Sequence, residues 1–552
     1  MEILKTYELA SGQEINLSKS EVFFSRNLSI AAQEDLSNIM GVKHVLGTGT
    51  YLGLPSMVGR SKKATFAYIK DRIWKRINGW RSRPLSRAGK EVMIKSVLQA
   101  IPAYIMNIYI LPDTLINDIE RMLNSFWWGG GNDNKGIRWL AWDKLTCPKN
   151  EGGLGFRDFH SFNMAMVAKQ GWNFMNNPTS LVARIYKARY FPQNSFLSSN
   201  LGNNPSFAWR SIWRARKVLL LGCRWQIGDG SNIKVMREPW LRVDNGSCVN
   251  GPQTHHVYEL SVCNLLLPNA KRWDENKIYS MFSLEDAHDI LTVPLFDLVR
   301  EDKLIWKEEN NGVYSVRSGY RKLMEAENRG YCSGRDDGWR SLWKIHAPPK
   351  TKHLLWRLCR ECLPTRSRLR SRYVTCPLEC PLCLSQDETD WHLFFNCGAV
   401  KDAWQNMGLS HIIEPRLLMF NNSRDFIFDI CRNATEVEAS KVAVLVWFLW
   451  QHRNNVVWNE NNATLLQVGV QACTYWTQWT ACNALSLARQ QPEIQQTTAT
   501  SLLQWQQPSP GHLKYNVDAS FYNMAGATGW GWVVRDSRGH FHLAGTNIFI
   551  HH

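Results

Sequence analysis

One cluster of cysteine and histidine residues constrains the fold of this chain more than any other feature. Cys380 and Cys383 are separated by two residues, His392 follows after eight more, and Cys397 after a further four. A Cys-x2-Cys turn can aim two thiolates at one point, and a short helical step can bring the histidine and the last cysteine there. The spacing therefore predicts a zinc site that is structural, because protein ligands fill all four positions and leave none for a substrate water.

Two alternatives stay open at this site. Cys376 lies four residues before Cys380 and could replace it as a ligand. The same residues could also be reduced side chains of a core that holds no metal. The chain does not open with a basic region followed by an apolar stretch and a cleavage site. We therefore expect an intracellular protein, nuclear or cytoplasmic, that is not secreted. In such a compartment its 14 cysteines are reduced or bind metal instead of forming disulfides.

Basic residues are concentrated in two stretches. The 552 residues include 65 Lys and Arg against 48 Asp and Glu, which gives a net charge of +17. Residues 60–95 carry a net charge of +10 and residues 350–372 carry +7, so the two stretches account for the whole excess. Lys and Arg are the usual contacts of backbone phosphates, so RNA or DNA is the expected partner. The alternative for each stretch is a helix face that contacts only water.

The first basic stretch has the pattern of an amphipathic helix. Apolar residues recur every three or four positions, which predicts one buried face with the charges on the others. The apolar positions are Phe66, Ile69, Ile73, Ile77 and Trp80. The candidate phosphate contacts are Lys62, Lys63, Lys70, Arg72, Lys75 and Arg76. After a break at Pro84, the pattern continues through Val92, Met93, Val97 and Ile101.

The second basic stretch lies directly before the metal cluster. A basic helix beside a zinc loop, with Trp356 and Trp391 nearby, offers phosphate contacts together with rings on which bases can stack. Trp356 and Leu355 fit core positions better than a surface role. The candidate phosphate contacts are Lys350, Lys352, Arg357, Arg366, Arg368, Arg370 and Arg372.

Other segments predict local structure. Residues 225–233 read as a strand, a tight turn and a second strand, and residues 304–320 as a strand, a turn and a helix capped by Ser315 or Ser318. Residues 405–488 look mostly helical. The Gly-rich run at 152–155 lacks the Gly-Lys-Ser/Thr ending of a phosphate loop, which argues against nucleotide binding there. The longest apolar run, at 442–450, has nine residues, whereas a membrane span needs about 20, so no membrane partner is expected.

Several motifs surround the metal cluster in a distinctive order. They are Trp343-Lys-Ile-His-Ala-Pro-Pro349, Leu355-Trp356-Arg357-Leu358, Leu363-Pro364-Thr365-Arg366, Glu388-Thr389 before His392, and Trp404. Together with the Cys/His set they closely resemble the reverse-transcriptase zinc-binding domain of plant LINE-type (non-LTR) retroelements. Segments at 11–20, 51–55, 80–90, 126–129 and 152–155 are similar to the end of the polymerase centre, the thumb and the connection of the same elements.

The last forty residues resemble a different domain. Residues 514–520, Lys-Tyr-Asn-Val-Asp-Ala-Ser, followed by 529–539 are similar to the opening of a type 1 ribonuclease H domain. In that family the first strand carries the first catalytic aspartate, which corresponds to Asp518, and the next two strands form a hairpin that would turn from Asp536 to Gly539.

The resemblance gives an expected fold and domain order. The fold is mainly α with small β elements, made of thumb and connection helices and the zinc-binding domain, followed by the truncated start of an α/β ribonuclease H-like domain. The expected domains are 1–50, the end of the reverse-transcriptase palm or thumb; 51–300, a basic helical thumb and connection region; 301–405, the zinc-binding domain; 406–489, a helical connector; 490–510, a linker rich in Gln, Thr and Pro; and 511–552, the ribonuclease H-like part.

Catalytic carboxylates decide the expected activity. A polymerase needs a Tyr/Phe-x-Asp-Asp strand, but the only Asp-Asp pair here, Asp336-Asp337, lies in a polar segment. Ribonuclease H holds two Mg²⁺ ions with several carboxylates, and after Asp518 the only other acid is Asp536. We therefore expect a retroelement-derived protein that binds nucleic acid and structural zinc without polymerase or nuclease activity, with Mg²⁺ only if a complete ribonuclease H site is assembled.

Two other functions stay open. One is an RNA–DNA hybrid ribonuclease, or a part of a reverse transcriptase that acts with other chains. The other is a domesticated scaffold that binds proteins.

Overall fold

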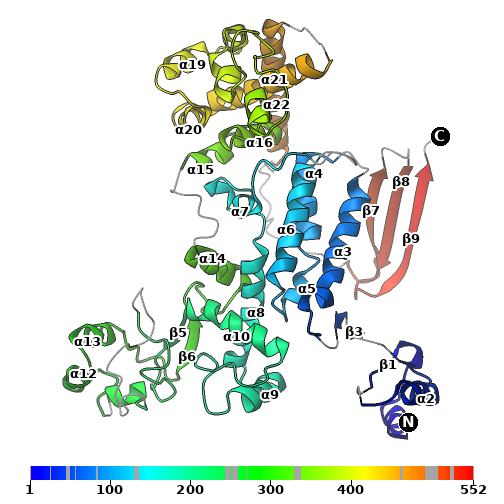
Figure 1. Cartoon of the computed structure of the whole chain (residues 1–552), viewed down its shortest axis with the longest axis vertical. Coiled ribbons are helices and arrows are strands. Elements are labelled where there is room, and N and C mark those ends of the chain that lie inside the picture. The colour runs from blue at the N-terminus through cyan, green and yellow to red at the C-terminus, as the bar shows by residue number, and fades with distance from the viewer. Residues whose placement is uncertain are drawn as a thin grey trace. The chain divides into compact units, whose positions relative to one another are not determined.

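The structure is a computed structural model that describes most of the chain (Figure 1). The described residues are 2–24, 27–44, 50–51, 53–55, 58–81, 85–129, 136–242, 249, 259–268, 270–327, 337–459, 464–490, 508–522 and 527–550. Helices predominate among them and the strands are few, which confirms the expected fold of mainly α structure with small β elements. The chain divides into two compact units, Met1–Thr477 and Gln478–His552. Most of the expected linker at 490–510 lies outside the described residues.

The first elements of the larger unit are short. They are α1 (Glu2–Ser11), β1 (Glu21–Val22), α2 (Ile30–Met40), β2 (Lys43–His44), β3 (Thr50–Tyr51) and β4 (Leu54–Pro55). Strand β1 pairs in parallel with β2, and β3 pairs antiparallel with β4. Every residue of α1 and α2 is at least partly exposed.

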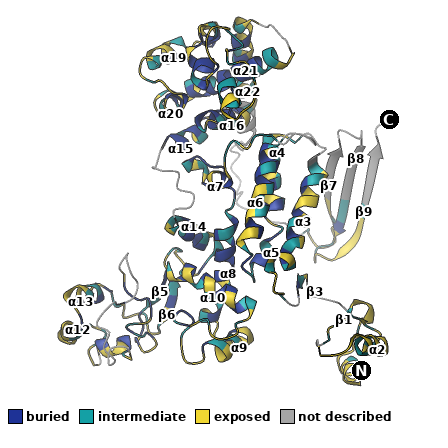
Figure 2. Cartoon of the chain, in the orientation of Figure 1, coloured by how far each residue is buried: buried dark blue, intermediate teal, exposed yellow. Residues whose placement is uncertain are grey.

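The basic amphipathic helix is confirmed as α3 (Lys62–Arg81). Its predicted apolar face is buried at Phe66, Ile69, Ile73 and Ile77, and Trp80 is half-buried (Figure 2). The next elements are α4 (Arg87–Val92), the π-helical turn η2 (Met93–Leu98), α5 (Ala103–Met106) and α6 (Asp113–Trp128). Helix α6 packs against both α3 and α4.

The continuation of the apolar pattern after residue 90 is confirmed only in part, because Met93 and Ile101 pack against the core but the fully buried positions lie one residue further along. Val92 is 57% exposed, whereas Ile94 and Leu98 are fully buried. The chain takes the wider π turn through η2, in which the Gln99 amide donates to the Ile94 carbonyl oxygen five residues earlier at 2.9 Å. That turn changes the helical period, so the face read from a 3.6-residue repeat is displaced.

The middle of the unit is a helical layer with one two-stranded sheet. Its elements are α7 (Trp142–Thr146), η3 (Lys149–Glu151), α8 (Phe159–Asn176), α9 (Leu181–Tyr190), α10 (Phe207–Leu220), β5 (Cys223–Gln226), η4 (Val262–Leu265), α12 (Glu275–Met281), α13 (Leu284–Leu291), β6 (Lys303–Trp306) and α14 (Val316–Ala326). The predicted cap is confirmed, because the Ser315 side chain accepts the Ser318 amide at the start of α14.

The hairpin predicted at 225–233 is wrong. Strand β5 pairs antiparallel with β6, which follows some eighty positions later, with Cys223 opposite Trp306. The Gly-rich segment after β5 forms a loop around Asp302, whose carboxylate accepts the amides of Gly228, Gly230 and Asn232 at 2.7, 2.9 and 2.9 Å. Three charge-assisted hydrogen bonds to one carboxylate hold this loop in place of a second strand.

The glycine run at 152–155 is a packing turn. A Cβ on Gly153 would lie 1.9 Å from the Cys147 carbonyl oxygen, so only glycine fits there. The Gly152 carbonyl oxygen accepts hydrogen bonds from Trp356 Nε1 at 2.9 Å and from Arg360 Nε at 2.6 Å. Trp356 and Leu355 are buried, as their apolar surroundings in the sequence predict.

The last part of the larger unit is helical, as expected for 405–488. Its elements are α15 (Asp337–Lys344), α16 (Pro349–Cys359), α17 (Arg366–Ser371), the π turn η5 (His392–Asn396), η6 (Gly398–Val400), α18 (Lys401–Asn406), α19 (Ser410–Leu417), α20 (Ser423–Asn433), α21 (Glu436–Asn459) and α22 (Leu465–Gln490), which continues past residue 477. Among the described residues, no helix is both long and apolar enough to cross a membrane.

The smaller unit contains a three-stranded antiparallel sheet. Strands β7 (Lys514–Tyr522), β8 (Ala527–Arg535) and β9 (Phe541–Ile550) pair in sequence order, with Asp518 opposite Gly531. The hairpin between β8 and β9 turns at Asp536–Gly539, as predicted: the Gly539 amide donates to the Asp536 carbonyl oxygen at 3.0 Å, and Gly539 has φ +80°.

Candidate metal centre

The predicted metal ligands come together in one group. The ligand atoms of Cys380, Cys383, His392 and Cys397 all lie within 4.8 Å of one another. His392 presents Nε2, which is 3.2 Å from Cys383 Sγ. A zinc ion with Zn–S bonds of about 2.3 Å separates its sulfur ligands by about 3.8 Å, so these side chains are within about 1 Å of a tetrahedral arrangement.

Local hydrogen bonds set this geometry. The Leu384 amide donates to the Cys380 carbonyl oxygen at 2.8 Å and closes the Cys-x2-Cys turn, where Leu384 has the left-handed φ of 55°. An antiparallel bridge between Glu379 and Asp387 holds the two sides of the loop. At the other end, the π turn η5 carries His392, and the Cys397 amide donates to the His392 carbonyl oxygen at 2.8 Å.

A hydrogen bond joins the thiols of Cys380 and Cys397 at the place where a cation would bind. A hydrogen bond with Cys397 lowers the pKa of Cys380 to about 6, and the same bond raises the pKa of Cys397. Thiolate is the form of cysteine that binds metal, so a cation between the two sulfurs would take the place of that proton. Three sulfurs and one imidazole nitrogen, three of the four residues buried, are a donor set that zinc prefers.

Cys376 is not part of this group. Its Sγ lies 3.6 Å from the Arg366 carbonyl oxygen, which it contacts as a weak donor. The arrangement of side chains therefore favours Cys380 over Cys376 as the first ligand.

A buried ion pair connects the metal loop to helix α21. The Glu388 side chain is fully buried and the Arg453 side chain is 5% exposed. Arg453 donates from Nε to Glu388 Oε1 at 2.5 Å and from Nη2 to Oε2 at 2.8 Å, a bidentate contact. Oε2 also accepts the Arg366 amide at 2.8 Å, and the Glu388 carbonyl oxygen accepts the Ser367 hydroxyl at 2.8 Å. One carboxylate thus joins α17, α21 and the segment that leads to His392.

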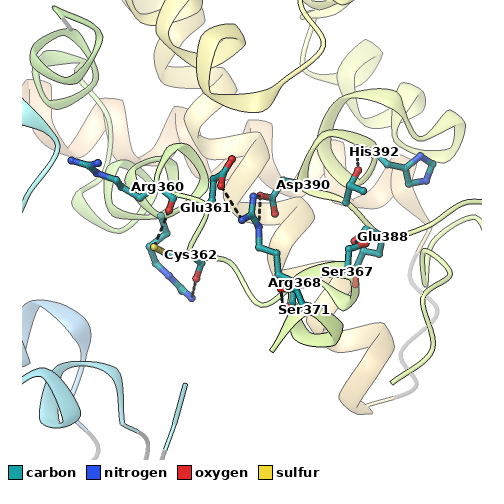
Figure 3. Close-up of polar contacts among 11 residues, drawn as sticks. Arg360, Glu361, Cys362, Ser367, Arg368, Ser371, Glu388, Asp390 and His392 are labelled. Atoms are coloured by element: carbon teal, nitrogen blue, oxygen red, sulfur yellow. Dashed lines mark hydrogen bonds and ion pairs between the residues drawn. The ribbon is translucent and has the colours of Figure 1, made fainter. Parts of the chain in front are cut away.

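A second ion pair joins α17 to Asp390, two residues after Glu388 (Figure 3). Arg368 in α17 donates from Nε to Asp390 Oδ2 at 2.8 Å and from a terminal nitrogen to the same oxygen. Burial lowers the pKa of Arg368, but Asp390 and Glu361 outweigh that effect and raise it overall. Arg453 was not identified from the sequence, because a single cation at the end of an apolar helix resembles any helix terminus. Glu388 appeared there only within a motif.

Two similar proteins come from the plant Arabidopsis thaliana. Residues 314–404 match the family of zinc-binding domains in reverse transcriptase, within the 301–405 domain expected from the sequence. The chain is 38% identical over 143 residues to an uncharacterized mitochondrial protein of Arabidopsis thaliana, a match that covers 93% of that protein and 26% of this chain. It is 26% identical over 512 residues to a protein of the same plant named provisionally as a ribonuclease H protein, which covers 78% of that protein and 88% of this chain.

The chain belongs to the plant retroelement proteins that carry a reverse-transcriptase zinc-binding domain. The resemblance seen in its motifs is thereby confirmed. The metal cluster of this retroelement protein falls inside the matched segment.

The second basic stretch of the retroelement protein divides into two groups. Some cations contact the protein itself: Lys352 Nζ donates to the carbonyl oxygens of Trp343 and Ile345, and Arg357 donates to that of Cys362 at 3.2 Å. Arg366 and Arg368 contact the metal loop as described above, and Arg366 also donates to the Glu379 carbonyl oxygen.

The remaining cations of this stretch are exposed. Lys350 lies 3.8 Å from the Trp447 ring centroid and 4.2 Å from that of Tyr475, Arg370 donates to the Cys376 carbonyl oxygen, and Arg372 faces the Trp139 ring at 6.0 Å. Their contact with nucleic acid stays a prediction.

The first basic stretch keeps more of its charge available. Lys63 and Lys70 share Asp118 of α6 at 3.0 and 3.6 Å, and Lys62 donates to the Gly59 carbonyl oxygen. Arg72, Lys75 and Arg76 are exposed, with no ion pair to any described residue. Asp518 lies in β7, and its side chain is outside the described part of the structure.

Proposed function

We propose that this retroelement protein binds RNA or DNA through the exposed basic face of α3, and that a structural zinc ion maintains the adjoining domain. The observation that carries the proposal is the group of three exposed cations, Arg72, Lys75 and Arg76, which lack ion-pair partners among the described residues. Unpaired surface cations on one helix attract a polyanion without regard to its sequence.

Aromatic side chains on α3 support a single-stranded ligand. Tyr68 lies four residues before Arg72, so the two share a face of the helix, and Tyr68 is 41% exposed. Trp74, next to Lys75 in the sequence, is 53% exposed. Rings next to cations allow bases to stack while phosphates contact Lys and Arg. A double helix would leave these rings without bases to stack on.

Zinc enters the proposal as a structural ion. Cys380, Cys383, His392 and Cys397 would hold it, and it would supply bonds that close the loop between α17 and η5. The loop in turn positions Glu388 and Asp390, which hold Arg453 and Arg368. The zinc-binding domain thus supports α16 and α17.

Binding can be measured with fluorescently labelled single-stranded RNA and DNA at a series of salt concentrations. The triple variant R72A/K75A/R76A should weaken binding and reduce the slope of log affinity against log salt by about two to three, one unit or slightly less for each lost contact. The matched control is R184A/K187A/R189A, which removes the same charge from exposed positions of α9. Equal losses in the two variants, or affinity that does not depend on salt, would contradict the role of α3.

A second candidate function is cleavage of RNA–DNA hybrids. It is favoured by the antiparallel sheet with Asp518 in its first strand and by the relative named for ribonuclease H. We expect no such activity, since Asp536, the other carboxylate of this segment, accepts the Arg538 and His540 amides at 2.8 Å within the turn. Cleavage of a labelled hybrid that requires Mg²⁺ and disappears in Asp518→Asn would establish the second function instead.

A further inference from the structure

Four buried nitrogen atoms lack hydrogen-bond partners where α4, α6 and α16 meet. Trp127 Nε1, Trp128 Nε1, His353 Nε2 and Arg357 Nε are each inaccessible to solvent and without a partner among the described residues. Trp127 is fully buried and Trp128 is 4% exposed. The indole and guanidinium nitrogens can only donate, and a buried donor without an acceptor costs about 1–3 kcal/mol, so these three donors point to an acceptor outside the described residues.

Arg87 and His353 both lie close to the Trp127 ring. The Arg87 guanidinium carbon lies 5.5 Å from the ring centroids of both Trp127 and Trp128. The His353 ring centroid is 5.7 Å from that of Trp127. We call Arg87, Trp127, Trp128, His353 and Arg357 the Arg87–Arg357 cluster.

No described carboxylate forms an ion pair with a cation of the cluster. Arg87 donates to the Trp127 carbonyl oxygen, and Arg357 donates to that of Cys362 at 3.2 Å. Glu91 accepts Lys95 at 2.7 Å and Lys149 at 3.0 Å, and Asp390 accepts Arg368 through Oδ2, while its buried Oδ1 has no hydrogen-bond partner among the described residues.

Burial and mutual repulsion act on these groups together. Burial, followed by the charge of Arg87, lowers the pKa of Arg357 to about 10. The same two causes lower the pKa of Lys90, at the edge of the cluster, to about 8. Buried positive charge without a counterion is unfavourable, and an anion would relieve it.

We propose that the Arg87–Arg357 cluster binds one small phosphate-type oxyanion. Two guanidinium groups match the charge and the several oxygens of a phosphate, to which arginine donates in a fork, and the indole and imidazole N–H groups supply further donors. The complete burial of Trp127 favours a free phosphate ion over the backbone of a polymer. The inference does not depend on nucleic-acid binding by α3.

Phosphate binding is tested on the full chain purified with zinc. Inorganic phosphate is titrated by calorimetry and by thermal shift, against chloride at equal ionic strength. We expect phosphate to raise the unfolding midpoint, and Arg357→Met to weaken phosphate binding by about tenfold or more, as expected for a lost charged hydrogen bond. Trp128→Phe keeps the ring and removes one donor, so it should weaken binding by a smaller factor even if Arg357→Met fails to fold. Arg184→Met, at an exposed position of α9, is the matched control and should bind phosphate normally.

Three results would overturn the proposal: equal midpoints in phosphate and chloride, undiminished phosphate binding in Trp128→Phe and Arg357→Met, or an equal loss in Arg184→Met. The first would mean that the donors contact water only.

A competition experiment identifies the source of the phosphate. If inorganic phosphate displaces labelled RNA from the unaltered protein but not from Trp128→Phe, the cluster accepts a backbone phosphate. If RNA binding is unchanged while phosphate binds, the ligand is the free ion.

Discussion

Arg453→Met should detach helix α21 from the metal loop. The substitution leaves the Glu388 carboxylate, which is fully buried, with the Arg366 amide as its remaining described donor. Removing one partner of a buried ion pair typically costs 3–5 kcal/mol, because the other charge stays desolvated, so about two to four orders of magnitude in the local closed-to-open ratio would be lost. Hydrogen exchange of the full chain, read in peptides from 436–459, measures this ratio directly.

Two comparisons isolate the buried pair. Arg416→Met breaks a pair of similar length, 2.7 Å to Asp429, but its side chains are 20% and 21% exposed, so the cost should be below about 1 kcal/mol. The double variant Glu388→Gln with Arg453→Met removes both charges and should exchange more slowly than Arg453→Met alone. If Arg453→Met accelerates exchange no more than Arg416→Met does, the buried pair contributes no more than a surface pair, and the link from metal loop to helix is refuted.

Three further predictions concern the metal, the packing and pH. Removal of zinc by a chelator should accelerate exchange in 366–400 but not in α10, and equal acceleration in both would contradict a local structural ion. Gly153→Ala should destabilise the protein by about 1–3 kcal/mol, because its Cβ would meet the Cys147 carbonyl oxygen, whereas Gly79→Ala, with open space in α3, should not. Burial lowers the pKa of His353 to about 3, with help from Arg357, while the unfolded chain takes up that proton near pH 6.5. Acid therefore favours unfolding. In phosphate-free buffer, the free energy of unfolding of His353→Gln should fall by about 2 kcal/mol less than that of the unaltered protein between pH 7 and 5. Identical pH profiles of the two proteins would show that His353 is not held neutral.

Features set by neighbouring residues could be predicted from the sequence. The Cys/His spacing determines a turn and a short helical step, and both are found with their ligand atoms together. The buried face of α3 follows from a repeat that the helix keeps without interruption. Where the helical period changes, at the π turn of η2, the same reasoning fails by one residue.

Features set by distant residues could not be predicted. The strand at 223–226 has the expected type but pairs with β6, because Asp302 holds the glycine loop that would otherwise form a hairpin. Arg453 and Glu388 are 65 residues apart, and neither position shows a local pattern that points to the other. The Arg87–Arg357 cluster joins three separate helices in the same way.

Counting charge along the sequence also treats every cation as equally available, and the structure shows why that is wrong here. In the second basic stretch, Arg366 and Arg368 serve the metal loop and Arg357 is turned inward, so much of its +7 acts within the protein. In α3, by contrast, Arg72, Lys75 and Arg76 have no described ion pair. Because only cations that release counterions on binding contribute to salt dependence, the measured salt slope should come from the exposed cations alone, in α3 and at Lys350, Arg370 and Arg372, and should be smaller than the net charge of the two stretches suggests.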